Sequence, residues 1–394
     1  MVYRLGIDVG SAYVSAAVIR DGRTEILPLG GQDARMPAVL FVRSDGEFLA
    51  GRAAQRRALA EPARSARDFV RRLGDPTPLL IAGVPYPPQA LIAHLLGLVA
   101  ATAAARFGGP PDGVTVAYPA CWSPYKADLL LGALRQADFD GAPDLAVTAA
   151  PVAMAAQRAH RTGSSAEDLV AVYDLGAGSF DAAVVGGHGP ELLGTATGME
   201  QFGGFDMDEA LLAHVLAAAG VPDGTESATG LTDPGRVAWR ARLRAECAEA
   251  KELLSEDSET EISVDTGGGS AQAVTVTREQ FERLIRPALV ATVKGLRRAL
   301  RSVPVEASEL HGLLLHGGCA RIPLAQLLLA EELGPDVSFD LRPPEEIALG
   351  AALLAAGFPA LGFDSEGDAV VPMETVVIGA PLATSLPPSD PRMS

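Results

Sequence analysis

The chain contains one short pattern twice, and this internal repeat constrains the fold more than any other feature of the sequence. GIDVGSAYVSAAVI at 6–19 and VYDLGAGSFDAAVV at 172–185 each read as strand, aspartate, glycine turn, hydroxyl residue and second strand. A duplicated unit implies two similar lobes. Short apolar strands alternate with longer helical patterns in the rest of the chain, which is typical of α/β proteins. The sequence therefore predicts an α/β protein with two related halves.

Local patterns predict where the individual elements lie. Asp21-Gly22 between two apolar runs indicates a tight hairpin, and residues 38–51 read as another. The Pro-Pro pair at 87–88 indicates a helix start. Residues 363–394 are rich in Pro, Ser and Asp and predict a partly disordered tail around one strand-like stretch. Helical periodicity predicts helices over 52–73, 88–106, 123–137, 206–219, 236–255, 278–301, 323–333 and 344–356.

Composition and charge exclude some classes of partner. The formal net charge is −17, whereas nucleic acids and anionic membranes attract basic proteins, so we expect neither as a partner. The isolated cysteines Cys121, Cys247 and Cys319 favour a reducing cytoplasm. The start, MVYRLGIDVG, has no signal-peptide form. The longest apolar stretches, such as 91–105, fall short of the roughly 18 residues of a membrane span.

Each repeated turn follows an apolar strand, at the strand end where ligands gather in α/β sheets. Glycines let the backbone approach a phosphate and point N–H groups at it. Asp8, Asp174 and Asp181 could then hold Mg²⁺ through water, and Ser11 and Ser179 could donate hydrogen bonds to phosphate oxygens. An ordinary hairpin with an acid at its mouth is the alternative for either turn alone. The repetition favours a metal–phosphate site.

Three further segments support a nucleotide site, although each has a simpler interpretation. FGGFDMDEALL at 202–212 places two glycines at a helix start, which is either an anion site or a plain helix N-terminus. AEAKELLS at 248–255 is an amphipathic helix segment that could equally be a solvated face. LLLHGGCARIP at 313–323 is a buried strand ending in Gly-Gly, or an ordinary strand-to-helix turn.

The order of these motifs resembles the DnaK-type chaperones, the seventy-kilodalton heat-shock family of the actin-like ATPase superfamily. The two repeats are similar to its two phosphate loops, and FGGFDMD to its Leu-Gly-Gly-Glu-Asp-Phe-Asp stretch. HGGCARIP resembles its adenosine motif, EEIALGAALLAA the helix after it, and AYPACWSPYKADLLLGA its Val-Pro-Ala-Tyr-Phe stretch. The resemblance runs in order from about residue 3 to 357. It implies an actin-like ATPase fold, two duplicated lobes around a nucleotide cleft.

The resemblance also implies domain bounds and roles for individual residues. A nucleotide-binding domain would span 1–362, with a first lobe over about 1–186 and a second over about 187–362; 363–394 would be a tail that could contain a linker remnant. Asp8, Arg71, Asp174 and Asp181 would be catalytic, with Mg²⁺ held through water by the three aspartates. The contacts to ATP or ADP would come from Gly10, Ser11, Ala12, Gly176, Gly178, Ser179, Gly203, Gly204, Lys251, Ser255, Gly317, Gly318, Arg321 and Ile322.

The sequence departs from the family pattern where hydrolysis would be organised. The resemblance places Arg71 of FVRRLGD where the family carries its catalytic lysine, and arginine replaces a compact ammonium with a planar fork. Ala150 falls where the family has a glutamate that organises the metal-bound water. Ser11 and Ala12 replace a pair of hydroxyl residues, so one hydroxyl is lost. We therefore expect ATP hydrolysis to be slow or absent.

The adenine side of the site also departs from the pattern. Lys251 and Ser255 match adenosine contacts of the family. Ala248 replaces a ribose-binding glutamate, Glu252 replaces the arginine that stacks on adenine, and Pro344 replaces an acid near the adenosine pocket. Nucleotide binding is therefore expected to be weaker than in the family.

These features predict a heat-shock-chaperone-like ATP-binding protein without the substrate-binding domain, acting as a nucleotide-dependent switch or co-chaperone-like module on an unknown protein partner or client. An actin-like-fold sugar kinase or phosphatase is one alternative, although Ala150 removes the obvious base. A filament-forming protein and a nucleotide-free pseudo-ATPase interaction module are others. The histidines have no metal-ligand spacing and are expected on the surface or in the core: His94, His160, His188, His214, His311 and His316.

Overall fold

The computed structural model describes most of the chain up to Gly357. The chain divides into two parts, Met1–Gly362 and Phe363–Ser394. The second part contains the predicted tail with its strand-like stretch at 369–380, and it lies outside the described residues. The described residues are 2–31, 33–137, 139, 142, 144–163, 168–186, 190–221, 234–265, 271–304, 309–334 and 337–357.

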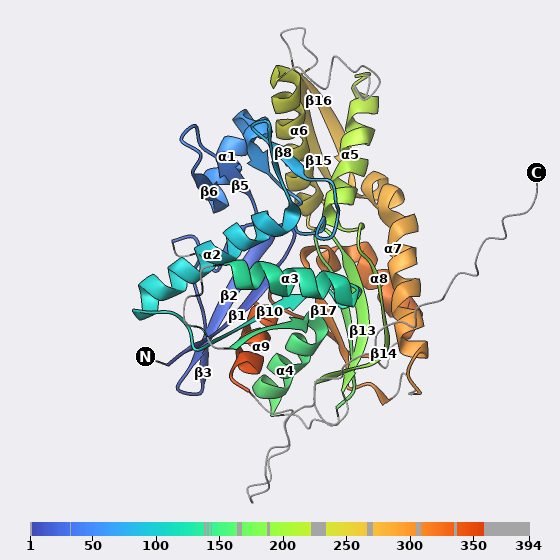
Figure 1. Ribbon diagram of the computed structural model, residues 1–394. Helices are drawn as coiled ribbons and strands as arrows, with labels where there is room; N and C mark the ends of the chain where they lie inside the picture. The colour runs from blue at the N-terminus through green and yellow to red at the C-terminus, as the bar shows by residue number, and fades with distance from the viewer. Residues whose placement is uncertain are drawn as a thin grey trace, which may run out of the picture. The chain divides into compact units, whose positions relative to one another are not determined.

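In this part of the chain, two larger sheets contain the two copies of the sequence repeat (Figure 1). The first has the strand order β11-β10-β1-β2-β3, with β4 paired to β2, and the second has the order β14-β13-β12-β17-β18. The first sheet consists of β1 (Arg4–Val9), β2 (Tyr13–Arg20), β3 (Arg23–Ile26), β4 (Arg35–Pro37), β10 (Gly113–Tyr118) and β11 (Asp144–Ala149), and the second of β12 (Val170–Leu175), β13 (Phe180–Gly186), β14 (Glu191–Met199), β17 (Leu313–His316) and β18 (Phe339–Leu341).

The two sheets have the same topology. β1 pairs antiparallel with β2 and parallel with β10, just as β12 pairs antiparallel with β13 and parallel with β17. The outer pairs match as well, because β2–β3 and β13–β14 are antiparallel while β10–β11 and β17–β18 are parallel. This correspondence confirms the predicted α/β class and the duplicated unit.

The strands place the border between the halves earlier than the sequence suggested. β12 and β13 belong to the second sheet, so residues 170–186 are not part of the first half as expected. The last helix, α9 (Glu346–Ala355), instead packs on β1, β2 and β10 of the first sheet. The physical reason is that a repeat begins with its own β-hairpin, and the hairpin joins the sheet that follows it.

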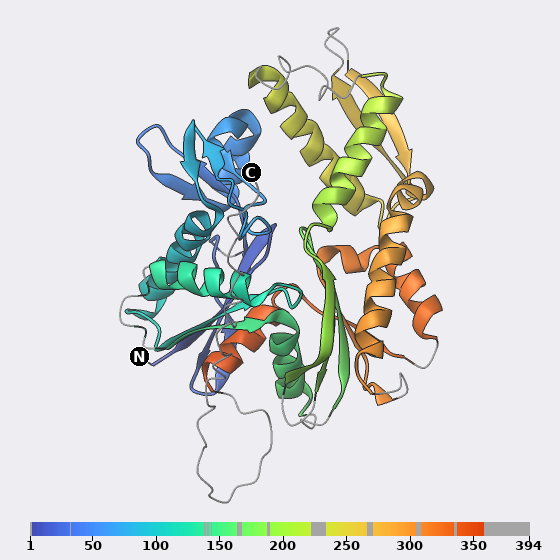
Figure 2. The same ribbon diagram turned by 45° about the vertical axis from the view of Figure 1, so that its right-hand side comes forward.

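Helices cover both sheets. α2 (Pro88–Phe107) and α3 (Pro124–Gln136) lie across one face of the first sheet in Figure 1, and α4 (Ala150–Thr162) and α9 lie between the two sheets in Figure 2. On the second sheet, α7 (Arg278–Arg301) packs against β13 and β14, and α8 (Pro323–Leu333) packs against α7. The helices α5 (Gly204–Ala218) and α6 (Pro234–Leu253) pack against each other and against the pair of strands at 259–265 and 271–277.

Small residues allow α4 and α9 to pack closely between the sheets. Their shared core joins Ala117 of the first sheet with Val172 and Leu314 of the second. A methyl group added at Gly350 of α9 would overlap the carbonyl oxygen of Ala153 in α4. The two halves of the repeat are therefore held together by a dry, closely packed layer.

Smaller sheets extend from each half. The first half adds β5 (Leu40–Val42), β6 (Phe48–Ala50) and β7 (Ser65–Ala66), the hairpin β8 (Leu79–Ile81) and β9 (Val84–Tyr86), the helix α1 (Gly51–Ala60) and the short 3₁₀ helix η1 (Pro62–Arg64). The second half adds the hairpin β15 (Glu259–Asp265) and β16 (Ala271–Thr277), together with the 3₁₀ helix η4 (Gly318–Arg321).

Most local predictions are confirmed. Asp21 and Gly22 form the hairpin turn with φ of 50° and 74°, and residues 38–51 form the β5–β6 hairpin. The helix predicted over 52–73 is wrong beyond Ala60, because Pro62 begins a 3₁₀ turn and the chain then pairs as β7. The strands β4, β7, β8, β9, β14, β15, β16 and β18 were not predicted.

Helix α2 corrects the expectation that every apolar stretch is too short to span a membrane. This helix has 20 residues and is apolar enough, by length and composition alone, to cross a membrane. In the structure Leu91, Leu95 and Val99 are fully buried against the first sheet. The buried face of α2 therefore belongs to the core of the first half.

Candidate functional site

Three carboxylates gather where the first strand of each repeat ends. Asp8 of β1 and Asp174 of β12 occupy equivalent places in the two sheets. Asp181 of β13 is the direct cross-strand partner of Asp174. We call Asp8, Asp174 and Asp181, together with His316 described below, the carboxylate cluster.

Burial makes two of these acids weak. Asp181 is 3% exposed and accepts a hydrogen bond from the Cys121 backbone N–H at 2.7 Å. Burial, with the nearby charge of Asp174, raises the pKa of Asp181 to about 8. Burial also raises the pKa of Asp8 to about 7, against the opposing effects of His316 and Arg35 and with a further rise from Asp174. Both aspartates are therefore weaker acids than exposed aspartates.

His316 lies in the core, one of the two places expected for the histidines, and there it joins the cluster. Its Nδ1 lies 3.0 Å from Asp174 Oδ1, and the residue is 6% exposed. Burial acts to lower the pKa of His316, but the charges of Asp174 and Asp8 outweigh it and raise the pKa to about 9. A signal was available in the sequence, because His316 is the last residue of the strand LLLH that runs into Gly-Gly.

The two glycine turns touch one another. Gly176 N–H donates to Ser179 O at 3.0 Å, which closes the second turn. A methyl group added at Gly178 would overlap Ser11 Oγ of the first turn. The first turn, which contains Gly10 and Ala12, is held by a 2.8 Å hydrogen bond from Ala38 N–H to Ala12 O. The contact brings the two predicted phosphate loops to a single point.

At the start of α5, the backbone N–H groups already donate hydrogen bonds to acceptors within the protein. Gly203 N–H donates to Asp206 Oδ2 at 2.9 Å, Gly204 N–H to Gly176 O at 3.0 Å, and Phe205 N–H to Ala177 O at 2.8 Å. These bonds occupy the N–H groups that an anion would use at this helix end. Gly203 and Gly204 therefore position the second turn in this structure.

Lys251 lies behind the same glycines. Its Nζ pairs with Asp208 Oδ1 at 2.7 Å and donates to Gly204 O at 3.2 Å. A methyl group added at Gly204 would lie 2.9 Å from Cys319 Sγ and 3.0 Å from Lys251 Nζ. Burial raises the pKa of the Cys319 thiol to about 11, so it is neutral near pH 7. Lys251 is thus already paired within the protein.

The other predicted adenosine residues divide between surface and core. Ser255 is half-buried and Glu252 exposed, while Arg321 is exposed. Ile322 is 4% exposed and packs in the core of the second half.

Gly317 is required by the backbone in the turn after β17. It has a φ of 85°, and an added methyl group would overlap Leu175 O. Gly318 follows it at the start of η4.

Arg71 belongs to a group that joins the two halves, which we call the Arg–Phe clasp: Asp68, Arg71, Phe205, Asp206 and Arg244. Arg71 Nη1 pairs with Asp206 Oδ2 at 3.0 Å, and Arg244 Nη2 lies 3.6 Å from Asp68 Oδ2. The guanidinium carbons of Arg71 and Arg244 lie 5.7 and 5.9 Å from the Phe205 ring centroid. Arg71 thus lies at the turns, since its Cδ would be 3.2 Å from a methyl group added at Gly178.

The described residues include no group of three or more His, Cys, Asp or Glu side chains arranged to hold a metal directly. One oxygen of Asp181 bonds Cys121, and one oxygen of Asp174 bonds His316. A hydrated ion such as Mg²⁺ would therefore contact these carboxylates through its water molecules, at the second oxygen of each.

The position predicted to have lost a glutamate is apolar. Ala150, the first residue of α4, is 6% exposed and packs in the layer between the sheets.

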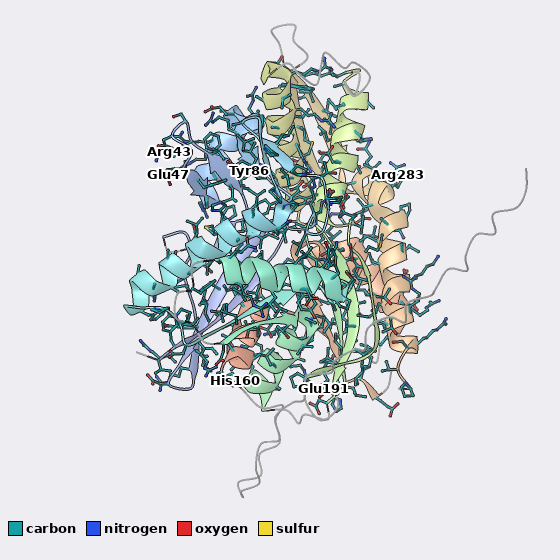
Figure 3. All side chains as sticks on the ribbon, in the orientation of Figure 1. Arg43, Glu47, Tyr86, His160, Glu191 and Arg283 are labelled. Carbon is teal, nitrogen blue, oxygen red and sulfur yellow. The ribbon has the colours of Figure 1, made fainter. Side chains whose placement is uncertain are left out.

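His160 lies at the other end of α4, and Figure 3 shows it with Glu191 far from Tyr86 and the β5–β6 hairpin. His188 lies outside the described residues.

Comparisons with known proteins identify a family and relatives with similar sequences. The family described as Hsp70 protein matches residues 81–360. A chaperone protein HscA homolog of Pseudomonas fluorescens is 29% identical over 374 residues, which cover 89% of this chain and 57% of that protein. The chaperone protein DnaK of Nitrosopumilus maritimus is 27% identical over 364 residues, covering 89% and 55%. The chain therefore spans just over half the length of the curated relatives it matches.

Proposed function

Because the chain belongs to the Hsp70 family, a family of ATP-binding chaperones, we propose that it binds ATP or ADP between the glycine turns that follow β1 and β12. The contact between Ser11 and Gly178 carries this proposal, because it joins equivalent strand ends of the two repeats. The turns would offer backbone N–H groups to phosphate oxygens, and Ser11 and Ser179 their hydroxyls. Mg²⁺, when bound, would offset phosphate charge, held through water by Asp8, Asp174 and Asp181.

We expect hydrolysis to be slow or absent. The apolar packing of Ala150 leaves no carboxylate at that position to orient an attacking water. The guanidinium of Arg71 is engaged by Asp206. The loss of one charge-stabilising contact costs roughly 10²–10³ in rate in other active sites. The protein would then act as a nucleotide-dependent switch rather than as a rapid ATPase.

The partner in this proposal is another protein, either a client or a regulatory chain, in the cytoplasm. The net charge of −17 disfavours nucleic acid and anionic membranes. The free cysteines Cys121, Cys247 and Cys319 suit a reducing compartment.

The test is the melting temperature with ATP, ADP or GTP in the presence of Mg²⁺. Ligand at 100 times its dissociation constant stabilises the folded state by about 2.7 kcal/mol. We expect ATP and ADP to raise the melting temperature of the wild type, and Asp174→Ala to remove the effect. A single-turnover assay with ATP then measures hydrolysis. No shift with any nucleotide at millimolar concentration would refute nucleotide binding.

A nucleotide-free interaction module is the second candidate. The occupied N–H groups of Gly203, Gly204 and Phe205, and the Lys251–Asp208 pair, favour it, because protein acceptors and donors already satisfy them. The same melting experiment separates the two functions. The remaining alternative, a sugar kinase or phosphatase, lacks a carboxylate base at Ala150.

A further inference from the structure

When the two copies of the repeat are compared, the residues paired with the equivalent aspartates Asp8 and Asp174 in the neighbouring parallel strand differ. In the first sheet, Asp8 of β1 is the register partner of Ala117 in the parallel strand β10. In the second sheet, Asp174 of β12 is the register partner of His316 in the parallel strand β17. The fold therefore accepts alanine at this position, and the imidazole is an addition made only beside Asp174.

The imidazole of His316 occupies one of the two oxygens of the Asp174 carboxylate. Its Nδ1 lies 3.0 Å from Asp174 Oδ1, and the residue is 6% exposed. The backbone of β17 is fixed by its pairing with β12 on one edge and β18 on the other. His316 is thus a fixed donor to Asp174 rather than a mobile surface group.

A hydrated cation at the same carboxylate would compete with this bond. Outer-shell binding works through hydrogen bonds from the ion's water molecules to carboxylate oxygens. At Asp174 one of the two oxygens already accepts from His316, and at Asp181 one already accepts from Cys121 N–H. A metal gains less from carboxylates whose hydrogen-bonding capacity is partly used.

We infer that His316 takes over at Asp174 the part that Mg²⁺ would play, so that adenine nucleotide binding by this chain depends little on Mg²⁺. The inference rests on the proposed function, and it assigns His316 as a specificity-determining residue for the metal requirement. Without the imidazole, the free Asp174 carboxylate repels the nucleotide phosphates unless a metal ion screens it. Removing His316 therefore introduces a metal requirement.

The test compares dissociation constants for ADP, measured by calorimetry with Mg²⁺ and with EDTA. For the wild type we expect the two constants to agree within about threefold, since His316 already makes the hydrogen bond that water on the metal would donate to Asp174. For His316→Ala, which copies Ala117 of the first repeat, we expect binding in EDTA to weaken by about tenfold or more relative to Mg²⁺. His316→Gln, which keeps a donor beside Asp174, should stay close to the wild type.

The matched control is His311→Gln. His311 also faces an aspartate, with Nε2 3.4 Å from Asp168 Oδ1, but it is exposed and precedes the start of β17, whereas His316 is at the end of that strand. Its replacement should leave the ratio of the two constants unchanged. A wild type that binds ADP only with Mg²⁺ overturns the inference, as does His316→Ala with an unchanged ratio in a folded protein. A wild type that binds no nucleotide under either condition refutes the proposed function itself, and the inference with it.

Discussion

The Arg–Phe clasp should control how fast nucleotide leaves. Asp68 and Arg71 come from the first half, whereas Phe205, Asp206 and Arg244 come from the second, so separating the halves must break both ion pairs. Asp68 has a φ of 57°, and asparagine tolerates this left-handed conformation as well as aspartate does. The double variant Asp68→Asn with Arg71→Gln therefore removes both pairs without new backbone strain.

The magnitude follows from the exposure of the two pairs. The Arg71–Asp206 side chains are 17% and 34% exposed, and those of Arg244 and Asp68 are 32% and 22% exposed. Partly exposed pairs contribute about 0.5–1 kcal/mol each. The double variant should therefore lose about 1–2 kcal/mol of the interaction free energy that the two ion pairs contribute between the halves. Nucleotide should then leave about five to thirty times faster.

Stopped-flow release of a fluorescent ADP, chased with unlabelled ADP, measures this rate. Added salt should accelerate release from the wild type and should have less effect on the double variant, because screening weakens exposed charge pairs. The matched control is Asp33→Asn, which removes the exposed Arg52–Asp33 pair within the first half. An unchanged release rate in the double variant, or an equal change in the control, would refute the role of the clasp.

Three further outcomes are expected. Gly350→Ala should destabilise the protein by about 2 kcal/mol or more because its methyl group overlaps Ala153 O, whereas Gly97→Ala in α2, with open space around it, should stabilise it by about 0.5–1 kcal/mol in urea titrations. Gly317→Ala, at a φ of 85°, should cost about 1–3 kcal/mol in the same titrations, and an unchanged midpoint would contradict the assigned backbone strain. In EDTA the melting temperature should fall from pH 6.5 to 8. His316, whose pKa is raised to about 9, contributes stability below pH 6.5 that is lost as pH rises through 9. Asp8 and Asp181, whose folded-state pKa values are raised to about 7 and 8, contribute stability at low pH that is lost as pH rises from their ordinary pKa toward those values. A flat profile would show that the cluster does not titrate in this range.

Much of the architecture could be predicted because the strands of the repeat have a recognisable local pattern in the sequence. The strands around Asp8 and Asp174 are nearly continuous apolar runs bounded by glycine turns, and such runs identify buried strands without tertiary information. The residues of β15 and β16 alternate between exposed and buried over only part of each strand, and β18 is only three residues long. None of these three strands therefore has a clear local pattern in the sequence.

The border between the halves and the position of His316 beside Asp174 could not be predicted, because both depend on which strands pair and in which register. A local sequence pattern does not contain this information. The pairing of Asp174 with His316 joins residues 142 positions apart, and the return of α9 to the first sheet joins residues still farther apart. The same holds for the start of α5, where acceptors from the second turn occupy the N–H groups that the sequence had offered to an anion.

Hydrogen exchange with and without ADP tests the central proposal most directly. The proposal predicts slower exchange in peptides covering both the turn after β1 and the turn after β12, with the β5–β6 hairpin unchanged as an internal reference. Protection of both turns together would place the nucleotide between the two repeats. Protection of only one turn, or of neither at saturating ADP, would contradict the account.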